Sequence, residues 1–239
     1  FEFLIIDDGS TDKSYSIIQK YQSQDKRILS LQHDTNLGAV TTRNEGLSLA
    51  KTNMVAFMDA DDISHIDRLQ MQIDYMKDHP DVGICGTCYK FIGARNDAVF
   101  FPMDDAELKV KLLWTCPLLQ GSTLLNKQCL GQVIFNQDYE YAEEYGMYVD
   151  LFPNIKIANI NKVLYFYRIQ QANMSLIHRN QQVLSYKKAR FVLLSKTDVD
   201  YSVEEGDLFH RVSEEEKGFS LGELLILERL FLRIIEKLG

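Results

Sequence analysis

Short apolar segments alternate with amphipathic segments over the first ninety residues, and no other feature of the chain constrains the fold as strongly. The apolar segments predict strands at residues 1–7, 27–33, 54–60 and 82–93. The intervening segments predict helices at residues 10–24, 39–52 and 64–81. A repeated strand–helix–strand order implies right-handed crossovers and parallel strands. We therefore expect an α/β fold with a mostly parallel central sheet flanked by helices.

The remainder of the chain is less regular. We predict a helix at 104–114, strands at 121–127 and 162–169, and an aromatic-rich loop that enters a helix within 133–152. From Gln170 onward the pattern is helical, which divides the chain into 1–175 and a helical appendage at 176–239. The closing helix carries apolar residues at helical spacing: Leu224, Leu227, Phe231, Ile234 and Leu238. Such a stripe is usually core, but on a terminal helix it can also contact a membrane surface or a second copy of the chain.

Composition excludes several classes of protein. The 239 residues carry a formal net charge of −8, which argues against a general nucleic-acid-binding surface because phosphate binding needs a basic field. No apolar run of 18 residues occurs, so we predict no membrane span. We expect a cytoplasmic protein that works either in solution or at the inner face of a membrane.

Four cysteines in a chain of this length do not predict a disulfide framework. Cys85 and Cys88 form a C-x-x-C, but no second cysteine pair or nearby histidine supports a redox or metal site. We interpret them as small apolar residues of a strand in a protein from a reducing compartment.

Two predicted strands end in clusters of carboxylates. Asp7 and Asp8 follow the first strand, and Asp59, Asp61 and Asp62 follow the third. One such cluster is often a helix cap or an Asx turn, but ligands of open parallel sheets bind at the carboxyl ends of the strands. Because Mg²⁺ binds through one or two carboxylates together with substrate phosphates, the D-x-D spacing is typical of a metal–phosphate site.

Several longer segments resemble one protein family. They are "FLIIDDGSTDKS", "NLGAVTTRNEGLSLAKTNMVAFMDADD" and "IDRLQMQIDYMKDHPDVGICG". The family 2 glycosyltransferases of GT-A fold carry a D-D-G-S turn, an N-x-G-x-x-x-x-R-N segment, a D-A-D-D motif and an R-L helix in this order. "YAEEYGMYVDL" is similar to the family's A-E-D-Y-x-L-W motif, and "VLYFYRIQQANMS" to its Y-R-x-H segment. The resemblance covers residues 1 to about 175 and implies a GT-A fold.

The resemblance implies a nucleotide-sugar donor, typically a UDP-sugar. Asp8 matches the aspartate that reads the nucleotide base, and Asp7 is its neighbour in the same pocket. Arg43 matches a basic residue that contacts the donor, although pairing with a neighbouring acid is the alternative.

The resemblance also implies a divalent metal, Mn²⁺ or Mg²⁺, bridging the diphosphate. Asp61 matches the metal ligand of the D-x-D pair, and Asp59 matches the residue that faces the ribose or the ion. Asp62 has two interpretations, a third member of this site or the cap of the following helix. Arg168 likewise either contacts the diphosphate or pairs with an acid in the fold.

Glu143 and Glu144 match the family's Glu-Asp pair, whose second member is the general base. The implied reaction transfers a hexosyl or N-acetylhexosaminyl group, with inversion, to a hydroxyl of a saccharide or lipid-linked saccharide in surface-polysaccharide synthesis. The alternative is that both glutamates are solvated charges at a helix start.

The chain departs from the family pattern at three places. The family's first strand–helix unit is not seen before the D-D-G-S segment, so we expect an N-terminally truncated chain. Glu144 replaces the usual aspartate, and Gln170 stands where histidine is common. These departures are the only support for an alternative, a catalytically impaired glycosyltransferase-like binding or scaffold domain. A nucleotidyltransferase is a further alternative, although we see no Gly-rich basic phosphate loop.

Overall fold

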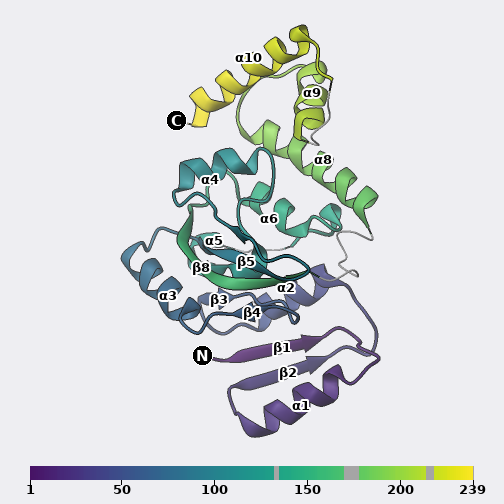
Figure 1. The fold of residues 1–239 in the computed structure, drawn as a ribbon, viewed down its shortest axis with the longest axis vertical. Helices are drawn as coiled ribbons and strands as arrows, with labels where there is room; N and C mark the ends of the chain where they lie inside the picture. Colours follow the sequence, from purple (N-terminus) through teal and green to yellow (C-terminus); the bar gives the residue numbers. More distant parts are fainter. Residues whose placement is uncertain (132–134, 170–177, 214–217, 239) are drawn as a thin grey trace. The chain divides into compact units, whose positions relative to one another are not determined.

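The computed structural model describes residues 1–131, 135–169, 178–213 and 218–238 (Figure 1). Internal contacts divide the chain into two compact units, which we call unit 1 (Phe1–Thr52) and unit 2 (Asn53–Gly239). The division falls between the second helix and the third strand of the predicted alternation. The predicted boundary after residue 175 lies outside the described residues and stays a prediction.

Unit 1 has the strand–helix order that the sequence predicts. Its elements are β1 (Phe3–Asp7), α1 (Ser14–Gln24), β2 (Ile28–Gln32) and α2 (Ala39–Leu49). β1 and β2 pair in parallel, with Phe3 opposite Ile28 and Asp7 opposite Gln32, which confirms the predicted crossover. Among the described residues, no strand pairs with the second edge of β1.

Unit 2 contains a second sheet. Its strands are β3 (Met54–Ala56), β4 (Ile63–Ser64), β5 (Ile84–Gly93), β6 (Ala98–Val99), β7 (Leu124–Asn126) and β8 (Ile157–Ile169). The strand order is β3-β7-β5-β8-β4, with β6 paired to β5. β5 and β8 are parallel, whereas the pairs β3–β7, β4–β8, β5–β6 and β5–β7 are antiparallel.

The sheet of unit 2 is mixed: its longest pair, β5–β8, is parallel as predicted, whereas the shorter pairs are antiparallel. β6 follows β5 after a short turn, and such a turn reverses the chain into an antiparallel pair. The parallel pair β5–β8 is separated in sequence by several helices, as a parallel connection requires.

The helices of unit 2 cover its sheet and extend the chain beyond it. They are α3 (Arg68–Asp78), α4 (Asp105–Leu112), α5 (Lys127–Leu130), α6 (Glu143–Leu151), α8 (Arg179–Lys196), α9 (Val203–Ser213) and α10 (Leu221–Leu238), with the 3-10 turns η1 (Gln120–Ser122) and η2 (Gln137–Tyr139). α3 ends just before His79-Pro80, where the sequence predicts its end, because proline cannot continue a helix. Asp104 is the N-cap of α4, and its side chain accepts a hydrogen bond from the Glu107 N–H at 2.9 Å.

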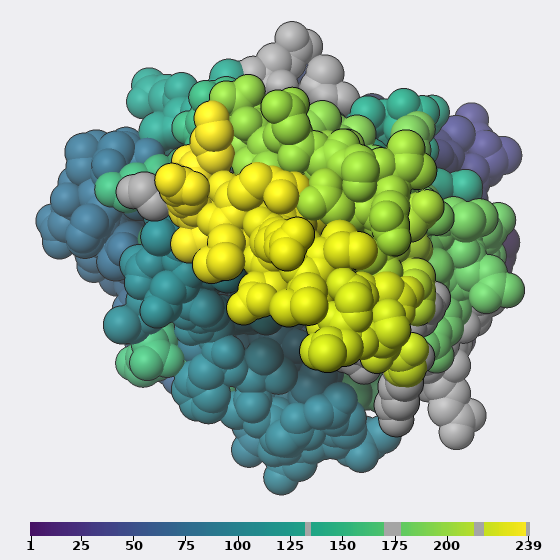
Figure 2. Space-filling model, turned by 90° about the horizontal axis from the view of Figure 1, so that it is seen from above, coloured from purple at the N-terminus to yellow at the C-terminus, as the bar shows by residue number. Residues whose placement is uncertain are grey.

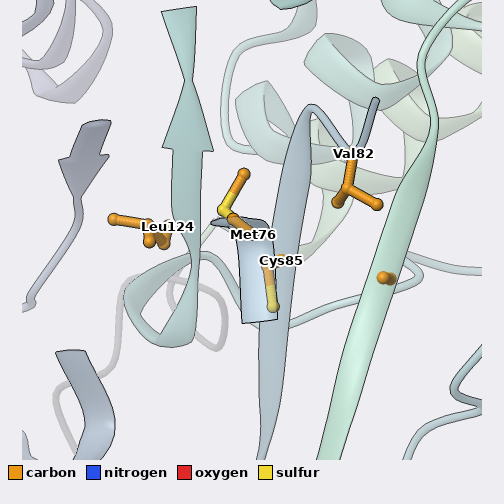
Figure 3. Packing of buried hydrophobic residues seen from close by; sticks show 5 residues of the cluster. Met76, Val82, Cys85 and Leu124 are labelled. Carbon is orange, nitrogen blue, oxygen red and sulfur yellow. The ribbon is translucent and has the colours of Figure 1, made fainter. Parts of the chain in front are cut away.

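One core cluster of unit 2 lies between α3 and the sheet. Figure 3 shows Met76 of α3 beside Cys85 of β5, Leu124 of β7 and the loop residue Val82. Cys85 and Cys88 are fully buried free thiols of β5, which confirms their interpretation as core residues. Burial raises the pKa of the Cys85 thiol to about 12, so the thiolate that redox or metal chemistry needs is disfavoured.

α9 and α10 pack against the rest of unit 2 through aromatic contacts with Trp114. The Trp114 ring centroid lies 4.8 Å from that of Phe231 in α10 and 5.8 Å from that of Phe209 in α9. Leu227 and Ile234 are buried as predicted, but Leu224 is 49% exposed. α10 lies at the surface (Figure 2), where further apolar side chains are exposed: Leu221, Leu225, Leu232 and Ile235.

Contacts of α10 with a membrane surface or with a second copy of the chain stay predictions. Among the described residues, no helix is both long enough and apolar enough to cross a bilayer.

Candidate functional site

In unit 1, Asp8 organises the loop between β2 and α2. Its Oδ1 accepts the Leu37 N–H at 2.8 Å, and its Oδ2 accepts the Gly38 N–H at 2.9 Å. A carboxylate oxygen can accept more than one hydrogen bond, so these contacts leave acceptor capacity for a base. Asp8 therefore holds the start of α2, and its predicted role in reading the base stays a prediction.

The neighbouring glycine allows this turn to close. Gly9 has a φ of +74°, and a Cβ there would lie 2.6 Å from the Asn36 nitrogen. Both the left-handed backbone and this close approach exclude a larger residue. Asp7 is 5% exposed, and its Oδ2 accepts a hydrogen bond from the Gln32 side-chain amide at 3.4 Å. Arg43, the other predicted donor contact of unit 1, is a partly buried residue of α2.

His33 lies between two carboxylates of unit 1. Its Nδ1 is 2.8 Å from Asp8 Oδ1, and its Nε2 is 2.7 Å from Glu45 Oε2. Hydrogen bonds to Asp8 and then to Glu45 raise the pKa of His33 above its ordinary value. Burial raises the pKa of Asp8, but the hydrogen bonds from His33 and from the two backbone N–H groups outweigh burial and lower it.

In unit 2, the D-A-D-D segment forms a turn between β3 and β4. The Asp62 N–H donates to the Asp59 carbonyl at 3.3 Å and closes the turn. Asp62 Oδ1 accepts the backbone N–H of Arg168 in β8 at 2.7 Å. The N-cap position of the following helix, α3, is occupied by Asp67. The interpretation of Asp62 as a helix cap is therefore wrong, because its side chain is bound to a strand instead.

Arg168 has a structural contact with the same turn. Its Nε donates to the Asp61 carbonyl at 2.7 Å. The partner is a backbone oxygen, so neither predicted interpretation describes this contact. The contact with β8 thereby fixes the backbone of Asp61, which is an exposed residue.

Arg68, the arginine of the R-L motif, and Gly121 support the start of the turn, although neither was predicted as a site residue. Arg68 is 2% exposed and donates from Nη1 to the Gly121 carbonyl at 2.6 Å and from Nη2 to the Phe57 carbonyl at 2.8 Å. Burial lowers the pKa of Arg68, and the charge of Asp59 acts in the opposite direction. A Cβ on Gly121 would overlap the Tyr165 hydroxyl and lie 2.8 Å from Asp59 Oδ2.

Asp59 and Asp61 are a suitable donor set for a hard divalent cation that also binds phosphates. Mg²⁺ needs one or two carboxylates when substrate phosphates and water complete its octahedron. Among the described residues, no group of three or more acidic, histidine or cysteine side chains forms a complete protein cage. The residues present therefore fit a cation held partly by its substrate.

Glu143 and Glu144 occupy the first turn of α6. Glu143 Oε1 accepts the Tyr141 N–H at 3.1 Å, and Tyr141 has a φ of +63°, which is unusual for a residue with a Cβ. Glu143 thus stabilises a strained turn. Glu144 is partly buried, and its charge contributes to the raised pKa of the Tyr148 hydroxyl, which is due mainly to burial.

The Tyr167 hydroxyl of β8 feels the charges of the predicted metal ligands and of the predicted base. Burial raises the pKa of the Tyr167 hydroxyl, and four carboxylates raise it further: Asp62, Asp59, Asp61 and Glu144. The sequence analysis missed Tyr167, although the alternation in "VLYFYRI" places it on the same face of β8 as Tyr165.

The comparisons with known proteins identify the family and the fold of the chain. Residues 1–123 match the family described as "Glycosyl transferase family 2". A curated protein of Haemophilus influenzae, named "Uncharacterized glycosyltransferase", is 25% identical over 223 residues, which cover 84% of this chain and 68% of that protein.

Solved structures share the fold. Residues 1–349 of S. aureus TarS in complex with UDP-GlcNAc superpose with a TM-score of 0.65 and 17% identity, covering 100% of this chain and 73% of that one. The mannosyltransferase PcManGT of Pyrobaculum calidifontis, in complex with GDP-Man and Mn²⁺, superposes with a TM-score of 0.59 and 14% identity, covering 99% and 75%. The predicted GT-A fold is confirmed, and because the family pattern covers more than half of its residues, the chain belongs to glycosyl transferase family 2.

Proposed function

We propose that this glycosyltransferase is metal-dependent and inverting, and that it transfers a sugar from a UDP-sugar or a related nucleotide-sugar to a hydroxyl of a saccharide or lipid-linked saccharide. The observation that carries the proposal is the D-A-D-D turn, which contacts from β8 fix at Asp59, Asp61 and Asp62 in a chain of this family. The turn supplies the carboxylates of Asp59 and Asp61 for a cation with its diphosphate, and the first turn of α6 supplies Glu144 for the acceptor proton.

The donor roles follow from the chemistry of each residue. Asp59 and Asp61 hold the cation, and Asp7, Asp8 and Arg43 of unit 1 contact the nucleotide. A bound divalent ion neutralises the charge that develops on the departing diphosphate. The cocrystallised UDP-GlcNAc of TarS and the Mn²⁺ of PcManGT support a donor and a cation of these kinds.

The transfer step needs a base for the acceptor hydroxyl. The hydroxyl oxygen forms a bond to the anomeric carbon while the bond from that carbon to the diphosphate oxygen breaks. The hydroxyl proton moves to Glu144, and the nucleoside diphosphate leaves. We assign the base to Glu144 because it matches the second member of the family's Glu-Asp pair, and a carboxylate can accept the proton of an attacking hydroxyl.

A donor screen on the full-length protein tests the proposal. UDP-glucose, UDP-galactose, UDP-GlcNAc and GDP-mannose are incubated with Mn²⁺ or with EDTA, and release of UDP or GDP is measured. We expect Mn²⁺-dependent release with one donor. Pyrophosphate release from a nucleoside triphosphate and a sugar phosphate would instead indicate a nucleotidyltransferase. Donor binding without any transfer would indicate a scaffold.

A further inference from the structure

The D-A-D-D turn is held along its length by β8, the strand that begins about a hundred residues later in the sequence. β4, which follows the turn, pairs with Phe166 and Tyr165 of β8. The Asp59 N–H donates to the Tyr165 hydroxyl at 3.3 Å. With the two contacts from Arg168, the turn has a backbone or side-chain bond to β8 at each of its three aspartates.

The Tyr165 hydroxyl is the buried member of this set. Tyr165 is fully buried, and the Arg68 guanidinium lies 5.3 Å from its ring centroid. Arg68 in turn binds the Phe57 carbonyl, two residues before Asp59. The ring is therefore fixed by a cation that also fixes the strand leading into the turn, so its hydroxyl has little freedom to move.

Gly121 shows how closely these groups approach the predicted metal ligand. A Cβ at this position would overlap the Tyr165 hydroxyl and would lie only 2.8 Å from Asp59 Oδ2. The Asp59 carboxylate, the Tyr165 hydroxyl and the Gly121 backbone thus meet at one point. The Tyr165 hydroxyl therefore contacts the Asp59 backbone beside the Asp59 carboxylate.

We propose that Tyr165 is a positioning residue for the metal–diphosphate site: its hydroxyl, by accepting the Asp59 N–H, fixes the backbone from which Asp59 and Asp61 reach the cation. The role rests on the function proposed above. It is distinct from ligation, because a buried hydroxyl that accepts a backbone N–H acts through Asp59. Residues that orient metal ligands in this way contribute about 10–100-fold to metal affinity or activity in other proteins.

The test uses Tyr165→Phe in the full-length protein, which keeps the ring against Arg68 and removes only the hydroxyl. The control is Tyr75→Phe, a partly buried tyrosine of α3 whose ring stacks on His79. Circular dichroism establishes that both variants are folded. Hydrogen exchange then reports on the backbone amides of residues 57–64 without any ligand.

The second readout is the affinity for Mn²⁺ in the presence of UDP, measured from the free-Mn²⁺ electron paramagnetic resonance signal. We expect Tyr165→Phe to exchange faster at residues 59–62 and to bind Mn²⁺ at least about tenfold more weakly, while Tyr75→Phe matches the wild type. Unchanged exchange, or faster exchange with unchanged Mn²⁺ affinity, overturns the positioning role.

Steady-state kinetics with the donor identified in the screen add a readout that loss of folded protein cannot imitate. A loss of positioning raises the donor KM and the Mn²⁺ requirement, whereas a smaller folded fraction lowers only kcat. Failure of the proposed function looks different: the wild type itself then shows no metal-dependent UDP binding. That outcome also overturns this inference, whatever the exchange data show for residues 57–64.

Discussion

The His33 imidazole and the Asp8 carboxylate lie 2.8 Å apart, and the same carboxylate binds the N–H groups at the start of α2. The pKa of His33 is raised, so its contribution to stability is full below about pH 6.5 and is lost as the pH rises through its higher folded value. The pKa of Asp8 is lowered, so its contribution is full above about pH 4 and is lost as the pH falls through its lower folded value. The cluster is therefore most stable between about pH 4 and pH 6.5.

Hydrogen exchange at Leu37 and Gly38 checks this window. After correction for intrinsic exchange, we expect protection of these amides to fall between pH 6.5 and pH 9 in the wild type. His33→Gln should abolish that pH dependence, whereas His178→Gln, whose ring contacts the Gln181 side chain, should keep it. Equal pH profiles in the wild type and His33→Gln would contradict the role of the charged imidazole.

Glu144→Gln and Glu143→Gln distinguish the roles of the two glutamates at the start of α6. Because Glu144 is the proposed base, we expect its amide variant to lower the kcat of transfer by about 10²–10⁴ with an unchanged donor KM. Glu143→Gln, which can still accept the Tyr141 N–H through its amide oxygen, serves as the matched control and should retain most of the kcat. A larger loss in Glu143→Gln would reverse the assignment.

Gly121→Ala tests the close packing beside Asp59. The new Cβ would overlap the Tyr165 hydroxyl, so we expect a loss of about 1–3 kcal/mol in the free energy of unfolding in urea. Gly222→Ala in α10 is the control, since its Cβ meets only the Ser220 hydroxyl at 3.9 Å. It should leave the stability unchanged or raise it. Equal stability of both variants would show that the backbone moves freely at Gly121.

Arg68→Lys tests the buried guanidinium. One ammonium cannot replace a planar fork that binds the Gly121 and Phe57 carbonyls together, so we expect a loss of about 3 kcal/mol in the free energy of unfolding. Arg27→Lys, at an exposed pair with Asp25, should change it by less than about 0.5 kcal/mol. A similar small loss in both variants would mean that the buried carbonyls find other partners.

Local patterns predicted the strands and helices of unit 1 and the acidic turns, because alternation, caps and D-x-D spacing are properties of neighbouring residues. The family resemblance predicted the GT-A fold and a general-base role for Glu144. The antiparallel pairs of unit 2 were not predicted, because they depend on which distant segments of the chain meet. Tyr165 was missed for the same reason: its partner Asp59 is 106 residues away, and a buried tyrosine in an apolar strand carries no local mark of that contact.

The central claim is that the D-x-D turn holds a cation together with a nucleotide diphosphate. Calorimetric titration of the full-length protein with UDP, with and without Mn²⁺, tests it on the wild type, Asp61→Ala and the control Asp74→Ala on the exposed face of α3. The account predicts Mn²⁺-dependent UDP binding that Asp61→Ala abolishes and Asp74→Ala retains. UDP binding that is independent of Mn²⁺ and unaffected by Asp61→Ala would contradict it.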